Sequence, residues 1–210
     1  MIAPMNSDIA LAVDSAVSYF NKNYGLDAKE VKMNSLYDAN RAVLNLMLSR
    51  VKDLKATLTA GKGNFINVKL DLIKYFFGKS ILSQGPLITL NGSEIKLFFD
   101  ESKAPHYEKL VKSWEVEFDK LLDENTILLM PTLPMTAPYH SEIFMFLPST
   151  CYSSIFNVLG LPSTQCPIGY NSDGMPFGIQ IIGSKNNDTL TIACAVELEK
   201  AFGGWKAPGT

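Results

Sequence analysis

The stretch that decides the fold covers residues 164–183 and has the sequence TQCPIGYNSDGMPFGIQIIG. Its two ends, residues 164–170 and 177–183, have a strand-like composition, and the turn-forming sequence NSDG lies between them at residues 171–174. Gly174 can adopt the positive φ that such a turn requires, because glycine has no Cβ. The stretch therefore predicts a β-hairpin.

A third strand is predicted upstream of the hairpin. Residues 127–130, ILLM, form a continuous apolar run, which is typical of a strand buried on both faces. Pro131, Pro134 and Pro138 follow this run, and each fixes its own φ and keeps the preceding residue out of the helical region. We therefore expect a stiff, extended loop after the strand.

Apolar side chains that recur every three or four residues predict helices around these strands. The predicted helices cover residues 9–20, begun by Ser7 or Asp8 and closed by Gly25, residues 36–58, residues 65–77, residues 107–121, and a last helix capped by Asp188. A short strand is predicted at residues 30–33, whereas residues 78–100 stay unassigned because Gly85-Pro86 and Asn91-Gly92 interrupt them. Helices mixed with core strands predict an α/β fold.

Composition narrows the class of protein. Hydrophobic residues make up 47% of the 210 residues and the net charge is −2, with no basic stripe, so we expect a globular core and no nucleic-acid partner. No run approaches the roughly 20 apolar residues of a membrane span, and the N-terminus has no secretory signal. Cys151, Cys166 and Cys194 fit neither a disulfide framework nor a metal spacing, so we predict reduced, mostly buried thiols and no metal or cofactor.

Several short motifs resemble the C-terminal part of the amidase-signature family, in the order and spacing of that family. They are LLMPTLPMTAP at residues 128–138, FNVLGLP at 156–162, GMPFGIQII at 174–182, and Asn187-Asp188 at the start of the last helix. Within the family, TQCP at 164–167 and AFGGW at 201–205 look most like the fatty-acid amide hydrolase 2 group.

The resemblance implies the C-terminal part of the amidase-signature fold, a mixed β-sheet covered by helices on both faces. It implies that residues 1–210 are one partial amidase domain, without the N-terminal half that carries catalysis. Relatives hydrolyse carboxamides with a Ser, cis-Ser, Lys triad, whose serines lie in a Gly/Ser-rich region upstream of everything matched here and whose lysine lies further upstream still. We therefore expect no catalytic residue in this chain, inactivity of the chain alone, and fatty amides or similar lipophilic carboxamides as substrates of the full-length enzyme.

Four side chains are predicted to line part of a substrate pocket, because pockets for acyl chains are concave and apolar. Tyr152 and Phe156 are the better candidates, and Phe144 and Met145 are equally well explained as ordinary core.

Other polar residues are given structural roles. The pair Ser153-Ser154 lacks the flanking glycines of a nucleophile loop, and His106 and His140 are expected to be surface or hydrogen-bonding histidines without a catalytic role. Asn157 and Gln180 are expected to be structural amides, at a helix-to-loop junction and along the sheet respectively.

Two alternatives to a partial enzyme stay open. The chain could be a short protein that binds a hydrophobic ligand or a partner without catalysis, or a subunit that complements a separately encoded N-terminal half. An intracellular location is expected, and the resemblance leaves open a homodimer and membrane association of the full-length protein.

Overall fold

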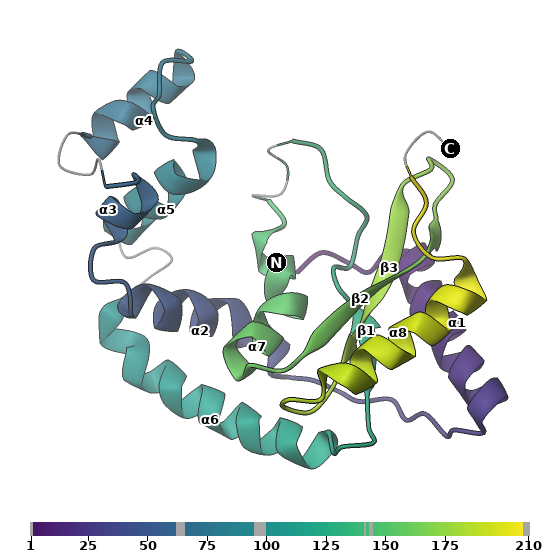
Figure 1. The fold of residues 1–210 in the computed structure, drawn as a ribbon. Coiled ribbons are helices and arrows are strands. Elements are labelled where there is room, and N and C mark those ends of the chain that lie inside the picture. Colours follow the sequence, from purple (N-terminus) through teal and green to yellow (C-terminus); the bar gives the residue numbers. More distant parts are fainter. Residues whose placement is uncertain (1, 62–65, 95–99, 141, 143–144, 208–210) are drawn as a thin grey trace. The chain divides into compact units, whose positions relative to one another are not determined.

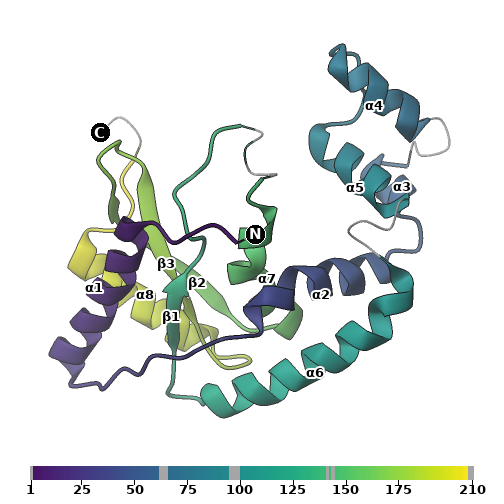
Figure 2. The ribbon, with the colours of Figure 1, turned by 180° about the vertical axis from the view of Figure 1, so that it is seen from behind.

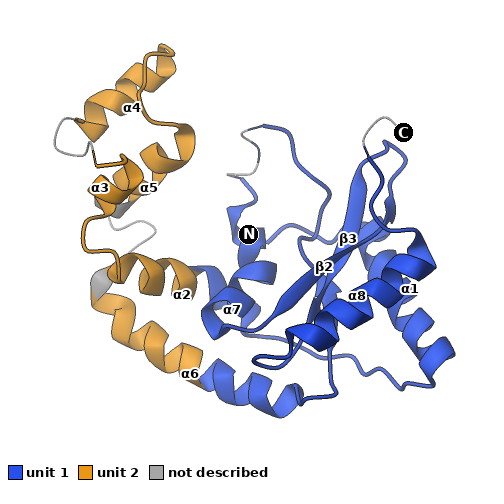
Figure 3. Cartoon of the chain, viewed as in Figure 1, with its two compact units in different colours: residues 1–40, 113–210 blue, residues 41–112 orange. Residues whose placement is uncertain are grey.

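The computed structural model describes residues 2–61, 66–94, 100–140, 142 and 145–207 (Figure 1). The chain forms two compact units, which are considered separately (Figure 3). Unit 1 comprises residues 1–40 and 113–210, and unit 2 comprises residues 41–112. Helices α2 and α6 each run from one unit into the other.

Unit 1 is built on a three-stranded antiparallel sheet with the order β1-β3-β2. The strands are β1 (Leu128–Pro131), β2 (Ser163–Tyr170) and β3 (Pro176–Ile182). The predicted hairpin is confirmed as β2 and β3, and Gly174 in its turn has a φ of 75°. The strand predicted at residues 127–130 is confirmed as β1, but only Met130 and Pro131 are buried, whereas Leu128 and Leu129 are half-buried.

Two helices cover one face of this sheet, as Figures 1 and 2 show. They are α1 (Ser7–Tyr24) and α8 (Asp188–Phe202). Their apolar stripes meet the sheet in one buried cluster, made of Ala12, Ala16, Phe20, Cys166, Ile168, Ile179, Ile181 and Leu198. Burial of this apolar surface is what fixes both helices on the sheet.

The predicted N-caps of both helices need correction. Asn6, and neither Ser7 nor Asp8, caps α1, because its side-chain oxygen accepts a hydrogen bond from the Asp8 amide at 2.8 Å. The N-cap position of α8 is likewise held by Asn187 and not by Asp188. Gly25 closes α1 in the left-handed conformation, as predicted.

The opposite face of the sheet is covered by α7 (Cys151–Leu159), which follows a short 3-10 helix, η4 (Leu147–Thr150). Ile179 and Ile181 face α1 and α8, so the side chain of Gln180 between them points to the α7 side. Helices on both faces of the sheet are therefore confirmed. The predicted helix at residues 107–121 is confirmed as α6 (Ala104–Leu121), with Pro105 in its first turn.

Unit 2 contains the second part of α2 (Leu36–Ser49), then α3 (Leu54–Leu58), α4 (Val68–Phe76), α5 (Gln84–Glu94) and the short helix η2 (Glu101–Lys103). A small apolar cluster holds α4 and α5 together; it is made of Ile66, Val68, Leu82, Leu87 and Leu90. In the described residues no helix is long and apolar enough to cross a membrane.

Three predictions for residues 30–77 are wrong in detail. The helix predicted over residues 36–58 is two helices, because the Asp53 side chain accepts from the Ala56 amide at 2.8 Å and starts a new helix there. Residues 30–33 form no strand, since they lie outside the core with Val31 exposed. The helix predicted at residues 65–77 begins later, at Val68, where Asn67 caps α4.

Residues 78–100, for which no element was predicted, contain α5. The Gly-Pro and Asn-Gly pairs that interrupt this stretch lie at the two ends of the helix. Gly85 and Pro86 lie in its first turn, where proline has no amide hydrogen bond to lose. Asn91 and Gly92 lie in its last turn.

A buried carboxylate closes the connection between α4 and α5. Asp71 is 2% exposed, and it accepts hydrogen bonds from Ser80 Oγ at 2.7 Å and from the amides of Ile81 and Leu82 at 3.2 and 3.1 Å. Burial opposes ionisation of Asp71, but these hydrogen bonds outweigh it and lower the pKa of the carboxyl. The contribution to stability is therefore present above the ordinary aspartate pKa of about 4 and is lost as the pH falls through the lowered pKa.

We expect Asp71→Asn to destabilise the α4–α5 pair by about 1–3 kcal/mol at neutral pH, because one acceptor becomes a donor that faces donors. Hydrogen exchange over residues 66–92, measured by mass spectrometry, should show faster exchange in this variant. Wild-type protection there, taken relative to the intrinsic exchange rate at each pH, should fall in acid, and the variant should lose that pH dependence. Asp53→Asn is the matched control, since asparagine also caps helices, and equal effects of both changes would contradict this role of Asp71.

Candidate functional site

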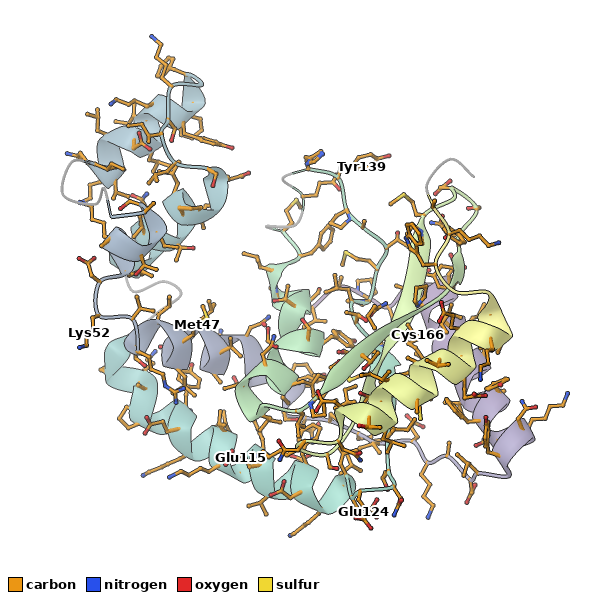
Figure 4. All side chains as sticks on the ribbon, in the orientation of Figure 1. Met47, Lys52, Glu115, Glu124, Tyr139 and Cys166 are labelled. Carbon is orange, nitrogen blue, oxygen red and sulfur yellow. The ribbon has the colours of Figure 1, made fainter. Side chains whose placement is uncertain are left out.

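The loop after β1 is tied at both ends to the first residues of the chain. The Asn6 amide donates to the Pro134 carbonyl at 2.8 Å, and the Ala3 amide donates to Ser149 Oγ at 3.0 Å. Ser149 is fully buried, so this bond is shielded from water. Figure 4 shows Tyr139 at the outer tip of the loop, away from the sheet, and its side chain is 83% exposed. The loop is thus hydrogen-bonded to the N-terminal segment at both ends, while Tyr139 at its tip is exposed to solvent.

A single asparagine fixes the entry to α7. The Asn40 side-chain amide donates to the carbonyls of Leu147 and Pro148 at 3.0 and 2.8 Å, and its oxygen accepts from Thr150 Oγ1 at 3.0 Å. Every hydrogen-bonding group of this side chain is therefore used within one turn of η4. The sequence analysis missed Asn40, because its partners lie 107 to 110 residues away and leave no local pattern.

A second amide joins α7 to the sheet. Gln180 is 3% exposed, and its Nε2 donates to the carbonyls of Pro131 at 2.9 Å and Tyr152 at 2.8 Å. Its Oε1 accepts from Ser163 Oγ at 3.0 Å. The predicted structural role of Gln180 is confirmed, and it extends beyond the sheet to the first turn of α7. Asn157, the other amide predicted to be structural, has an exposed side chain.

The predicted pocket residues lie in different surroundings. Tyr152 is half-buried on α7, and burial raises the pKa of its phenol. Phe156, one turn later, is 2% exposed and packs edge-on against Phe118, with ring centroids 5.9 Å apart at 89°. Met145 is 76% exposed in the segment before α7, and Phe144 lies outside the described residues. The structure thus brings Tyr152 and Phe156 onto one helix, with Met145 on the surface.

Both serines near the start of α7 are hydrogen-bonded to the backbone. Ser153 Oγ and Ser154 Oγ both donate to the Thr150 carbonyl, at 3.1 and 2.8 Å. In the described part of the chain neither hydroxyl is bonded to a histidine, a lysine or a carboxylate that could accept its proton. His106 and His140 are exposed, as predicted.

The three thiols lie in the interior or at its edge. Cys151, Cys166 and Cys194 are free; Cys151 and Cys166 are buried and Cys194 is half-buried, which confirms the prediction that these thiols are mostly buried. Burial raises the pKa of each of them, so the reactive thiolate is disfavoured. Figure 4 places Cys166 at the junction of the sheet and α8, where its Sγ lies 3.7 Å from the Ala195 carbonyl. Among the described residues, no three His, Cys, Asp or Glu side chains are grouped to hold a metal ion.

Residues 3–192 match the protein family described as Amidase. Fatty-acid amide hydrolase 2-A of Danio rerio is 31% identical over 214 aligned residues, which cover 100% of this chain and 40% of that protein. Fatty-acid amide hydrolase 2 of Homo sapiens is 29% identical with the same coverage. The chain therefore spans about 40% of the length of these curated relatives.

Solved structures of related fold also align with almost all of this chain. The alignment covers less than half of the length of each of those proteins. A 6-aminohexanoate cyclic dimer hydrolase complexed with substrate superposes with a TM-score of 0.69 at 16% identity, covering 98% of this chain and 44% of that one. The allophanate hydrolase of Kluyveromyces lactis has a TM-score of 0.65 at 19% identity, covering 95% of this chain and 30% of that one. At these identities the likeness concerns the fold alone.

Proposed function

The chain belongs to the amidase family, and from this premise we propose that it forms the C-terminal part of an amide hydrolase that acts on fatty amides or related lipophilic carboxamides. One observation carries this proposal. The whole chain aligns with fatty-acid amide hydrolase 2-A at 31% identity, whereas the alignment uses only 40% of that relative.

In this proposal the chain supplies sheet core and part of the substrate pocket. Gln180 and Asn40 hold the start of α7 by hydrogen bonds to its first turn and to η4. A helix fixed at this point can present Tyr152, whose ring is only half-buried, as a rigid wall for an acyl chain. Phe156, one turn later on α7, packs against Phe118, and Met145 and Phe144 are the remaining candidates for the pocket.

The proton transfer and the nucleophilic attack are assigned to the part of the family that this chain does not cover. The support for this assignment is that Ser153 and Ser154 are bonded to a backbone carbonyl and that burial disfavours ionisation of the three thiols. The chain alone is therefore expected to release no ammonia from a long-chain primary fatty amide. Release that disappears in Ser154→Ala would overturn this assignment.

The pocket role is tested in a fusion of this chain to the N-terminal part of the Danio rerio relative. Tyr152→Ala should lower kcat/KM for a long-chain amide more than for a two-carbon amide, by about 1–3 kcal/mol, because it removes hydrophobic contact with the chain. Tyr139→Ala is the matched aromatic control, since Tyr139 is at the exposed tip of its loop. Equal losses for both substrates in Tyr152→Ala, or in Phe156→Ala, would place that side chain in the core and not in the pocket.

A further inference from the structure

Tyr37, in the first turn of α2, carries an aromatic side chain that is 75% exposed. It lies three residues before Asn40, whose side chain is bonded to the Pro148 carbonyl in η4 and to Thr150 at the start of α7. Residues three apart on a helix are neighbours on its surface, so Tyr37 lies on the side on which α2 meets η4 and α7. Figures 1 and 2 show the start of α2 beside α7 in both views.

The phenols of Tyr37 and Tyr152 are neighbours. Tyr152 is half-buried in the first turn of α7. Burial raises the pKa of its phenol most, and the Cys151 thiol and the Tyr37 phenol raise this pKa further. Charges act on each other over a Debye length, roughly 10 Å, so the side chain of Tyr37 comes close to that of Tyr152. Two aromatic residues more than 100 positions apart in the sequence thus meet at the start of α7.

The segment that leads into α7 exposes two more apolar side chains. Met145 is 76% exposed and Leu147 is 40% exposed. We call these two side chains, together with Tyr37 and Tyr152, the α7 entry surface. Residues 143–172 contain no charged residue, so the part of this surface that η4 and α7 supply is uncharged. The α7 entry surface is therefore apolar and aromatic, with hydroxyl groups as its polar atoms.

We propose that the acyl chain of the substrate lies against Tyr37 as well as Tyr152, which makes Tyr37 a second residue that determines specificity for chain length. An acyl chain is apolar and gains free energy from contact with the α7 entry surface without requiring an ion pair there. An anionic ligand is disfavoured, because Asp38 is exposed next to Tyr37 and residues 143–172 supply no cation. This inference rests on the proposed function, since it assigns a further contact to the same substrate.

Kinetics of the fusion to the N-terminal part of the Danio rerio relative test the inference. Tyr37→Ala should lower kcat/KM for a long-chain amide about tenfold more than for a two-carbon amide, at the lower end of the range for hydrophobic pocket contacts. Tyr37→Phe should keep the wild-type preference, because it retains the ring. Tyr139→Ala is the matched control, since that side chain is 83% exposed, and it should keep the preference too. A selective loss in Tyr152→Ala without one in Tyr37→Ala would overturn this inference and leave the proposed function standing.

A second measurement on the same fusion needs no turnover. A long-chain primary amide with a diazirine in its chain is bound and irradiated, and trypsin then releases residues 33–41 as one peptide, because it cuts after Lys32 and Arg41. This peptide should carry the label. An excess of unlabelled long-chain amide should remove the label, and a two-carbon amide should not. A peptide without label, or a label that the long-chain amide does not displace, would mean that something other than the acyl chain covers Tyr37 and would contradict the inference.

Discussion

Gly178→Ala is expected to destabilise unit 1 by about 3 kcal/mol or more, because the sheet leaves no room for a methyl group at this position. A Cβ on Gly178 would lie 2.3 Å from the Cys166 carbonyl oxygen and 2.6 Å from Gln165 Nε2. The carbonyl belongs to the backbone of β2, which is paired with β3 at this point, so it cannot move aside without breaking the register. The glycine is required by close approach of two strands, not by a positive φ.

Urea unfolding followed by tryptophan fluorescence measures this loss. Trp114 is 4% exposed in unit 1, so its emission reports on unfolding there, and Trp205→Phe in all variants removes the second tryptophan. Gly169→Ala in the same hairpin is the matched control, because its Cβ would meet the edge of the Phe177 ring at 3.0 Å, and a side chain can shift. The control should lose clearly less stability, and an unchanged urea midpoint for Gly178→Ala would contradict the observed pairing of Gly178 with Pro167.

The elements that the sequence predicts best are those whose signals are local. The hairpin carries its own turn, and α6 carries a long apolar stripe whose members Tyr107, Val111, Trp114 and Phe118 are all buried. The prediction fails where two local signals compete. The apolar period continues across residues 50–53, but the Asp53 carboxylate bonds to the backbone there and starts a second helix.

The candidate site is less predictable, because its geometry depends on contacts between distant segments. Gln180 lies in a strand among apolar residues, and a buried amide in that position predicts a structural hydrogen bond. Asn40 lies on a helix with ordinary composition, so nothing in its neighbourhood indicates that it fixes η4. The sequence also does not indicate that Tyr152 is half-buried and Phe156 buried. Both are aromatic residues of one apolar helix, and their burial depends on distant segments that pack against it.

Gln180→Leu is expected to cost about 3 kcal/mol of unit 1 stability, because it removes the side-chain donor that two carbonyls share, one of them at a buried hydrogen bond. The lost partners are the carbonyls of Pro131 and Tyr152, one in β1 and one in α7, so the helix is released from the sheet. The Ser163 hydroxyl also loses its acceptor, but Ser163 is exposed and can bond to water instead. The loss is therefore dominated by the two carbonyls.

Gln180→Glu keeps the size and shape of the side chain but removes its amide donor. It therefore distinguishes the loss of the donor from the loss of packing. The carboxylate places an oxygen against two carbonyl oxygens in a buried site, so the folded state favours the protonated form and raises the pKa of Glu above its ordinary value of about 4.3. Stability relative to wild type should then be lowest at high pH and recover as the pH falls through that raised pKa, because the folded state binds the extra proton. Gln180→Leu has no group that titrates, so its loss of stability relative to wild type should stay constant over the same range.

Urea midpoints measured from about pH 8 to about pH 5 distinguish the two variants. A constant deficit for Gln180→Glu would mean that the side chain at this position does not face the two carbonyls, and α7 would then be held to the sheet by apolar packing alone.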